Sequence, residues 1–144
     1  MVDLVAEKMY KLFRTAYYLA LSERPFTDYP KIIELQNLNG IELGETCQND
    51  KATKEFISQI AGYFADELKN CIESLPFISI YSDGSTDRSE KEKEIVMVKV
   101  LDYFYPVIKY LKIEEPENTK AEGILAAINK AFEDVGVQDS GVLL

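Results

Sequence analysis

The chain has 144 residues, 47% hydrophobic and 28% charged, a composition typical of a soluble globular domain with a core of its own. Twenty-five acidic against sixteen basic residues give a net charge of −9, which disfavours non-specific binding to nucleic-acid phosphates. The sequence has no histidine, and this excludes Ser-His-Asp and Cys-His catalysis and histidine-ligated zinc.

The two cysteines, Cys47 and Cys71, form no Cys-x-x-Cys motif, so a zinc knuckle or a redox motif is excluded. We expect two free thiols, buried or partly buried, in a reducing compartment. The N-terminus carries charges among its apolar positions, unlike a signal or transit peptide, and no apolar run approaches the ~20 residues of a membrane span. The sequence therefore predicts an intracellular protein that is not secreted and has no membrane partner.

Apolar residues at spacings of three and four predict a first helix from about Val2 to Leu21. Its apolar face is expected to comprise Val5, Met9, Leu12, Phe13, Ala16, Tyr17 and Ala20. After an aromatic turn at 25–30 we predict a short helix over 31–36, stopped by Gly40. Its inward residues are expected to be Ile32, Ile33 and Leu35.

Asn49 or Asp50 is a predicted cap for a long helix that ends near Ser74. Its predicted apolar face comprises Phe56, Ile57, Ile60, Ala61, Phe64, Leu68, Cys71 and Ile72. Leu75-Pro76 ends the helical period, and the chain then changes to an extended pattern.

Three antiparallel strands are predicted at 77–82, 95–101 and 107–113. The charged run 90–94 is expected to be solvated, and the second strand is apolar enough to predict a central strand covered on both faces. Thr119 and Glu122 fit a capping box for a last helix that ends near Gly136. The predicted apolar face of that helix comprises Ile124, Leu125, Ile128, Ala131 and Phe132.

The predicted fold class is α+β: a helical N-terminal half, then a three-stranded antiparallel sheet, then a C-terminal helix. We divide the chain into a helical lead-in region (1–75), a sheet region (76–139) and a tail (140–144).

Asp83 is the candidate site residue, because it ends the first predicted strand before Gly84 and Ser85 reverse the chain. A strand that ends on an aspartate holds its carboxylate rigidly at the rim of a sheet. Asp-Gly is also a common hairpin signal, so on this stretch alone a turn role is the simpler interpretation. Asp87 fits a turn cap or a solvated position better than a second ligand, and the capping box suffices to explain Glu122.

The stretch 82–89, with the acidic run 90–94 and the apolar 95–99, resembles the start of the catalytic domain of hAT-type DNA transposases. The most similar branch comprises domesticated vertebrate proteins related to zinc finger protein 862. Further similar features are 25–30 before 33–36, Asn39-Gly40 with Leu43-Gly44, and 119–124. The resemblance extends from about Leu4 to Asp139, and its strength lies in the order and spacing of these features.

This resemblance implies the first half of a ribonuclease H-like fold. In the family, three acidic residues hold two divalent ions that cleave and join DNA, and Asp83 matches the first of them. No carboxylate follows Asp139, and the zinc finger and dimerisation region of the family are missing. We therefore expect a truncated, non-catalytic protein without a cofactor, with Asp83 as a vestigial metal ligand.

Such a protein is expected to act, if at all, in protein or nucleic-acid association, through an exposed sheet edge that recruits a partner or a second copy. Nucleic-acid binding is expected to be weak, and nuclear residence is implied by the resemblance alone; the other location considered is the cytoplasm. Two alternatives stay open. One is a metal-dependent ribonuclease H-like nuclease or transposase that uses Asp83 and Mg²⁺. The other is an unrelated α+β protein-interaction domain. Its strands would not lie in the order 3-2-1 with the helix after Thr119 returning beside the first strand.

Overall fold

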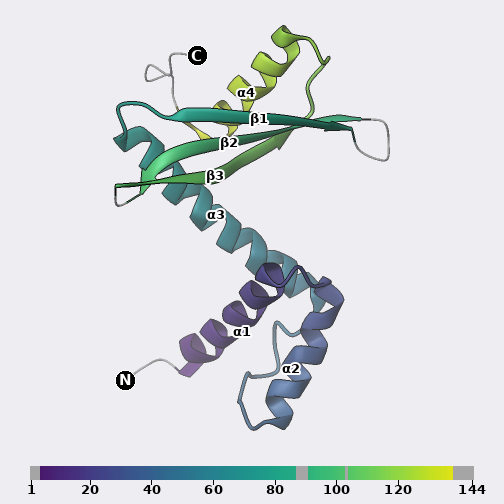
Figure 1. Cartoon of the computed structure of the whole chain (residues 1–144). Coiled ribbons are helices and arrows are strands. Elements are labelled where there is room, and N and C mark those ends of the chain that lie inside the picture. The colour runs from purple at the N-terminus through teal and green to yellow at the C-terminus, as the bar shows by residue number, and fades with distance from the viewer. Residues whose placement is uncertain (1–3, 87–90, 103, 138–144) are drawn as a thin grey trace. The chain divides into compact units, whose positions relative to one another are not determined.

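The computed structural model describes residues 4–86, 91–102 and 104–137. Figure 1 shows the order of elements, which confirms the α+β class. The elements are α1 (Leu4–Leu21), the short 3-10 helix η1 (Phe26–Asp28), α2 (Tyr29–Leu38), α3 (Asp50–Ser74), β1 (Ser79–Thr86), β2 (Glu92–Asp102), β3 (Tyr105–Glu114) and α4 (Ala121–Val135).

The chain forms two compact units, Met1–Tyr63 and Phe64–Leu144, which divide inside α3. The boundary differs from the 75/76 division expected from the sequence, because Leu68 and Ile72 of α3 belong to the core of the sheet.

The first unit packs α1, α2, the loop after α2 and the start of α3 around one apolar core. Tyr29 is fully buried there, and its hydroxyl lies 3.4 Å from the carbonyl oxygen of Leu12 and 3.3 Å from that of Cys47. Burial, and then the nearby Cys47, raises the pKa of Tyr29. The rings of Phe13 and Phe56 pack with centroids 4.3 Å apart. The tyrosine therefore satisfies its polar end while its ring fills the core.

The buried face of α1 differs from the predicted one. Leu19 and Thr15 are buried, whereas Val5 and Tyr17 are exposed. A threonine can occupy this face because its hydroxyl donates a 2.9 Å hydrogen bond to the carbonyl oxygen of Lys11, one turn earlier. In α2 the prediction that Leu35 faces inward is also wrong, since that side chain is 56% exposed.

The predicted helix ends are largely confirmed. The Asn49 side chain accepts a 2.9 Å hydrogen bond from the amide of Ala52, so Asn49 caps α3. Gly40 and Gly136 have φ of +80° and +78°, the left-handed conformation that stops a helix. Cys47 and Cys71 are free and half-buried, as predicted.

The start of α4 corrects a prediction. The helix begins at Ala121, its N-cap Lys120 makes no side-chain cap bond, and no capping box joins Thr119 to Glu122. Instead the Asn118 side chain accepts a 3.0 Å bond from the amide of Lys120. The Asn118 carbonyl oxygen lies so near Gly123 that a Cβ there would be 2.3 Å from it. The first turn of α4 thus packs against the loop at Asn118, and this contact leaves room only for glycine at position 123.

The sheet has the order β1-β2-β3, with both pairs antiparallel, so β2 is central as predicted. The register between β2 and β3 changes from Val96 opposite Lys112 to Met97 opposite Tyr110. One extra residue, Leu111, therefore forms a β-bulge in β3, and its side chain is buried in the core.

Strand β1 is longer than predicted. Asp83 pairs with Ile95 and Gly84 with Glu94, and pairing continues to Thr86 opposite Glu92. The predicted chain reversal at Gly84 and Ser85 is therefore wrong. The expectation of a solvated run at 90–94 is wrong at its end, because Glu94 is only 5% exposed. Residues 87–90, including Asp87, lie outside the described residues.

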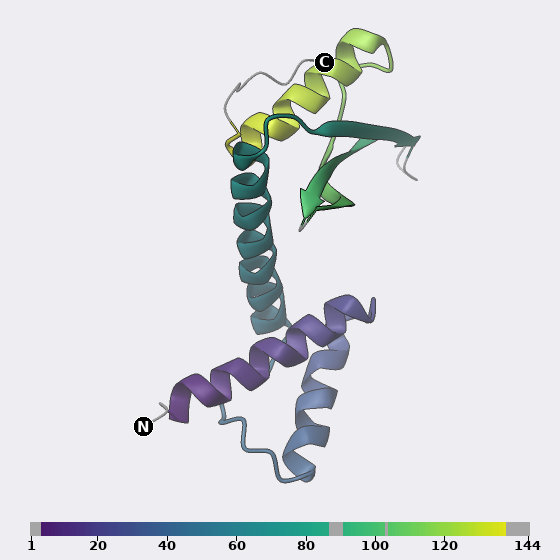
Figure 2. The same cartoon turned by 60° about the vertical axis from the view of Figure 1, so that its left-hand side comes forward.

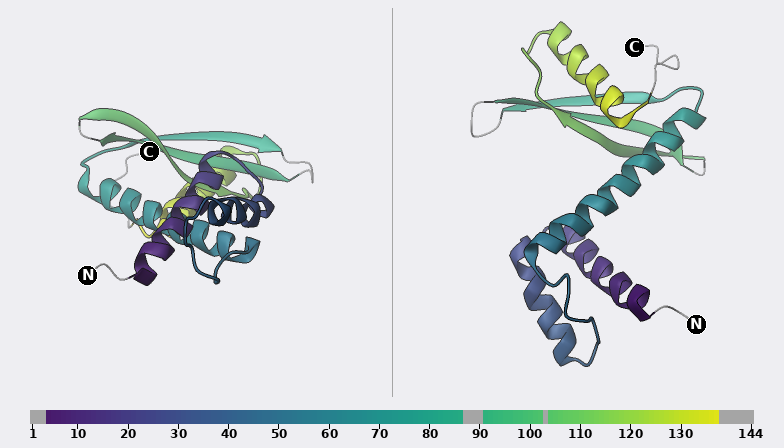
Figure 3. Two further views of the ribbon diagram at one scale, coloured as in Figure 1. Left: turned by 90° about the horizontal axis from the view of Figure 1, so that it is seen from below. Right: turned by 180° about the vertical axis from the view of Figure 1, so that it is seen from behind.

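One face of the sheet is covered by helices. Val96, Val98 and Val100 pack with residues of the second half of α3 and of α4, among them Leu68 and Phe132. Figures 1 and 2 show these helices on one side of the sheet. The right-hand view of Figure 3 shows the sheet from that side.

We call the other side the open face. The central row across this face is Tyr81, Met97 and Tyr110, and the outer two are 41% and 58% exposed. Leu101 on the same face of β2 is 48% exposed. Coverage of both faces of β2 is therefore not found in the described unit. The helix side also differs in α4, where Leu125, predicted to face inward, is exposed.

Candidate functional site

Asp83 lies within β1, four residues after the strand begins, and is exposed. Its partner across the sheet is Ile95, which places both residues on the open face beside Tyr81. Asp83 therefore lies in an edge strand, and the alternation of side chains along β1 places its carboxylate on the open face.

The nearest buried acid is Glu94, on the opposite, helix-covered face of the sheet. It lies across from Gly84 and accepts a hydrogen bond from the hydroxyl of Ser82. A Cβ on Gly84 would lie 3.1 Å from the Glu94 Oε2 atom, so the glycine leaves room for the carboxylate. Burial raises the pKa of Glu94, and the charges of Asp83 and Glu92 raise it further.

A second buried acid, Glu114, lies directly opposite Glu94 on β3 and is also 5% exposed. Its carboxylate pairs with Lys130 of α4 at 2.7 Å and with Lys112 at 3.2 Å. Lys112 also pairs with Asp134 of α4. These bonds raise the pKa of both lysines, chiefly through Asp134 for Lys112 and through Glu114 for Lys130. The network fastens α4 to β3.

The sheet does not gather the predicted site residues into a cation site. Asp83 and Glu94 lie on opposite faces of the sheet, and lysines already pair with Glu114. Glu122 is exposed in the first turn of α4. Among the described residues, no group of three or more cysteine, aspartate and glutamate side chains could hold a metal ion.

Sequence reasoning missed both buried glutamates, although the strand pattern carried a signal for Glu94. Glu94 stands two positions before Val96, and Val98 and Val100 continue the same alternation. Strand periodicity would have placed Glu94 on the valine face. No comparable signal identifies Glu114, because the bulge at Leu111 changes the alternation of β3.

The two edges of the sheet differ in chemistry. Strand β3 carries Pro106, the bulge at Leu111 and two lysines, Lys109 and Lys112, which are features that hinder the addition of another strand. Strand β1 has eight residues without proline, lysine or bulge, and all but Ile80 are exposed. Within the described residues, β1 is therefore the edge that best suits strand addition.

A comparison with protein-family models finds no match for the chain, and no solved structure matches it. In the parts of the chain that the structure describes, no helix is both long and apolar enough to cross a membrane.

Proposed function

We propose that this chain is a non-catalytic association module that adds a strand of a protein partner, or of a second copy, to the β1 edge. The observation that carries the proposal is the contrast between a plain, exposed β1 and a blunted β3. Backbone N–H and C=O groups along an edge strand are the natural partners of an incoming strand.

We further propose that the chain derives from a hAT-type transposase. Asp83 is then a vestigial metal ligand, and the chain itself uses no cofactor. The resemblance between Leu4 and Asp139 supports this origin. The strand order β1-β2-β3 agrees with such an origin, whereas the main contacts of α4 are with β3 and not with β1, where the family would place this helix. Nuclear residence follows from the same resemblance.

A protein partner is favoured over a nucleic acid by charge. The chain carries a net charge of −9, so phosphate contacts would be few and strongly weakened by salt. Strand addition depends on backbone hydrogen bonds and is far less sensitive to net charge. Any nucleic-acid binding should therefore disappear at physiological ionic strength.

Pairing of β1 with a second copy has a preferred register. Two antiparallel β1 strands related by a two-fold axis keep their open faces on the same side, so even positions pair with even positions. A register centred on Ser82 places Tyr81 opposite Asp83 of the second copy. A register centred on Asp83 would place two carboxylates opposite each other, which is unfavourable. Of these two registers, Asp83 therefore favours the one centred on Ser82.

The experiment compares two matched variants in sedimentation velocity over a range of protein concentrations. Tyr81→Glu and Tyr110→Glu both replace an exposed tyrosine that flanks Met97 on the open face. The native chain should dimerise as its concentration rises. Tyr81→Glu on β1 should weaken the dimer, because the register centred on Ser82 places each new carboxylate opposite Asp83 of the other copy, whereas Tyr110→Glu on β3 should leave it unchanged.

A native chain that remains monomeric at millimolar concentration would reject pairing with a second copy. Equal loss of the dimer in both variants would reject the choice of β1. Amide hydrogen exchange adds a direct readout, since β1 amides should become protected on association while β3 amides do not change.

A further inference from the structure

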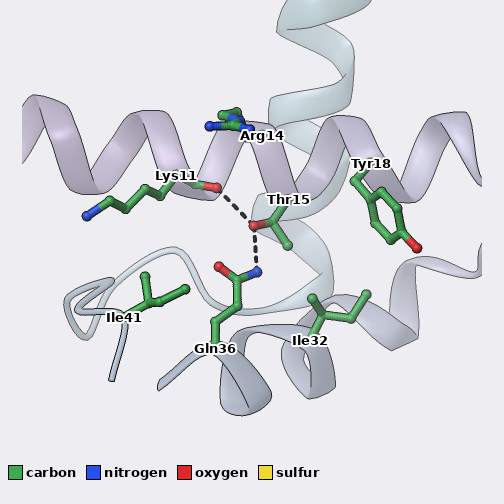
Figure 4. Close-up of a pocket in the computed structure, with 7 residues that line it drawn as sticks. All are labelled: Lys11, Arg14, Thr15, Tyr18, Ile32, Gln36 and Ile41. Atoms are coloured by element: carbon green, nitrogen blue, oxygen red, sulfur yellow. Dashed lines mark hydrogen bonds between the residues drawn. The ribbon is translucent and has the colours of Figure 1, made fainter. Parts of the chain in front are cut away.

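The N-terminal unit contains a cavity of about 390 Å³ between α1 and α2. Figure 4 shows α1 on one side, with the side chains of Thr15 and Tyr18 directed toward α2. On the other side lie Ile32 and Gln36 of α2 and Ile41 from the loop that follows. The volume falls in the range of small-molecule pockets, which is about 300–1,000 Å³.

The polar floor of this cavity is fixed by two hydrogen bonds. The Thr15 hydroxyl donates to the carbonyl oxygen of Lys11, so its oxygen accepts a 3.0 Å bond from Nε2 of Gln36. This bond sets the orientation of the Gln36 amide, and Figure 4 shows its oxygen on the side of Ile41. Thr15 is buried and Gln36 is half-buried, so these two hydrogen bonds form the base of the cavity.

The charge lining the cavity is opposite in sign to that of the whole chain. Lys11 and Arg14 line it and no acidic residue does, although the chain carries a net charge of −9. Lys11 pairs with Glu7 at 2.8 Å. Arg14 lies over the Tyr10 ring, 5.6 Å from its centre, and no ion pair of Arg14 is found among the described residues. The guanidinium is thus available to an anion.

The remaining lining is apolar. Ile32 is half-buried, and Ile41 and the ring of Tyr18 are exposed at the mouth of the cavity. An apolar body placed between these side chains would bury them, while an anionic group at its end would reach Arg14 and Lys11.

We propose that this cavity binds a small organic anion: a flat apolar body that carries one sulfonate, carboxylate or phosphate group. The apolar body lies against Ile32, Ile41 and Tyr18, and the anionic group pairs with Arg14. A hydrogen-bond donor on the ligand can use the free oxygen of Gln36. This proposal is independent of strand addition at β1, since the lining residues all belong to the first unit.

The test uses the full chain and two fluorescent probes of nearly the same shape. 1-Anilinonaphthalene-8-sulfonate carries the anion, and N-phenyl-1-naphthylamine lacks it. The native chain should bind the sulfonate with one saturable site and bind the neutral probe more weakly. Arg14→Gln should weaken sulfonate binding by about three- to fivefold, the scale of one partly exposed ion pair, and leave the neutral probe unaffected.

Lys51→Gln is the matched control, because it removes one positive charge from an exposed position of the same unit outside the cavity. The side-chain amide of Gln36 gives a local readout, since its NMR signals should shift on titration with the sulfonate. Equal weakening in Arg14→Gln and Lys51→Gln would overturn the proposal, because it would reduce the effect to net charge. Unshifted Gln36 signals at saturation would also overturn it.

Discussion

The same substitution, glycine to alanine, should have opposite effects at two helical positions of this chain. Gly62 lies within α3, and a Cβ there would meet nothing within 4 Å. Gly123 lies in the first turn of α4, where a Cβ would be 2.3 Å from the Asn118 carbonyl oxygen and 2.8 Å from its Oδ1 atom.

The magnitudes follow from these surroundings. Alanine in place of glycine in an open helix stabilises by roughly 0.5–1 kcal/mol, so Gly62→Ala should raise the free energy of unfolding by that amount. At Gly123 the same gain is offset by overpacking, which costs about 1–3 kcal/mol. The displaced Asn118 also loses its bond to the Lys120 amide, worth about 1 kcal/mol. Gly123→Ala should therefore destabilise by roughly 1–3 kcal/mol.

The assay is urea unfolding followed by far-ultraviolet circular dichroism. The native chain and the two variants are compared with the same slope of unfolding free energy against urea concentration. Gly62→Ala should move the midpoint up and Gly123→Ala should move it down. A Gly123→Ala chain as stable as Gly62→Ala would show that the loop at Asn118 does not press against the helix.

Three further predictions concern the sheet and its helix. Because burial raises the pKa of Glu94 above its unfolded value, its ionisation costs stability, and this cost is absent below about pH 4 and grows as pH rises. Glu94→Gln should therefore raise the unfolding free energy at pH 7 and change it little at pH 3.5, as measured by urea titrations; a larger gain at pH 3.5 would contradict this. Asn118→Ala should destabilise by about 0.5–2 kcal/mol, whereas Thr119→Ala should be nearly neutral, and thermal melts showing the reverse order would restore the capping box. Millimolar Mn²⁺ should broaden amide signals near Asp83 no more than those near the exposed Asp66, while selective broadening at Asp83 would support the nuclease alternative.

Periodicity predicted the existence and order of every long element. It was less successful at choosing the buried stripe of each helix. Leu19 and Thr15 lie on the core face of α1 while Tyr17 is exposed, and only the later contact with α2 decides between such neighbouring stripes. Small residues were also overlooked: Ala127 is buried in α4 where Leu125 was expected to face inward.

The local signals at the site misled for a physical reason. Asp83-Gly84 is a good turn sequence, yet Gly84 remains in the strand because pairing with β2 continues to Thr86, and the Glu94 carboxylate lies in the space that the glycine leaves. The cap of α4 was misplaced because Asn118, with no regular spacing to mark it, accepts a hydrogen bond from the Lys120 amide, whereas a capping box would have joined Thr119 and Glu122. Both outcomes depend on contacts between residues that local sequence rules consider separately.

The features that blunt β3, the bulge at Leu111 among them, limit how far association can proceed. With β3 blunted, two copies joined through β1 would form a closed pair whose outer margins accept no third copy. Deletion of Leu111 would restore a regular zigzag along β3 and leave the partners of Tyr110 and Lys112 on β2 unchanged. Pro106 and the two lysines of β3 would still hinder a third copy, so fibres of unlimited length would require their replacement as well.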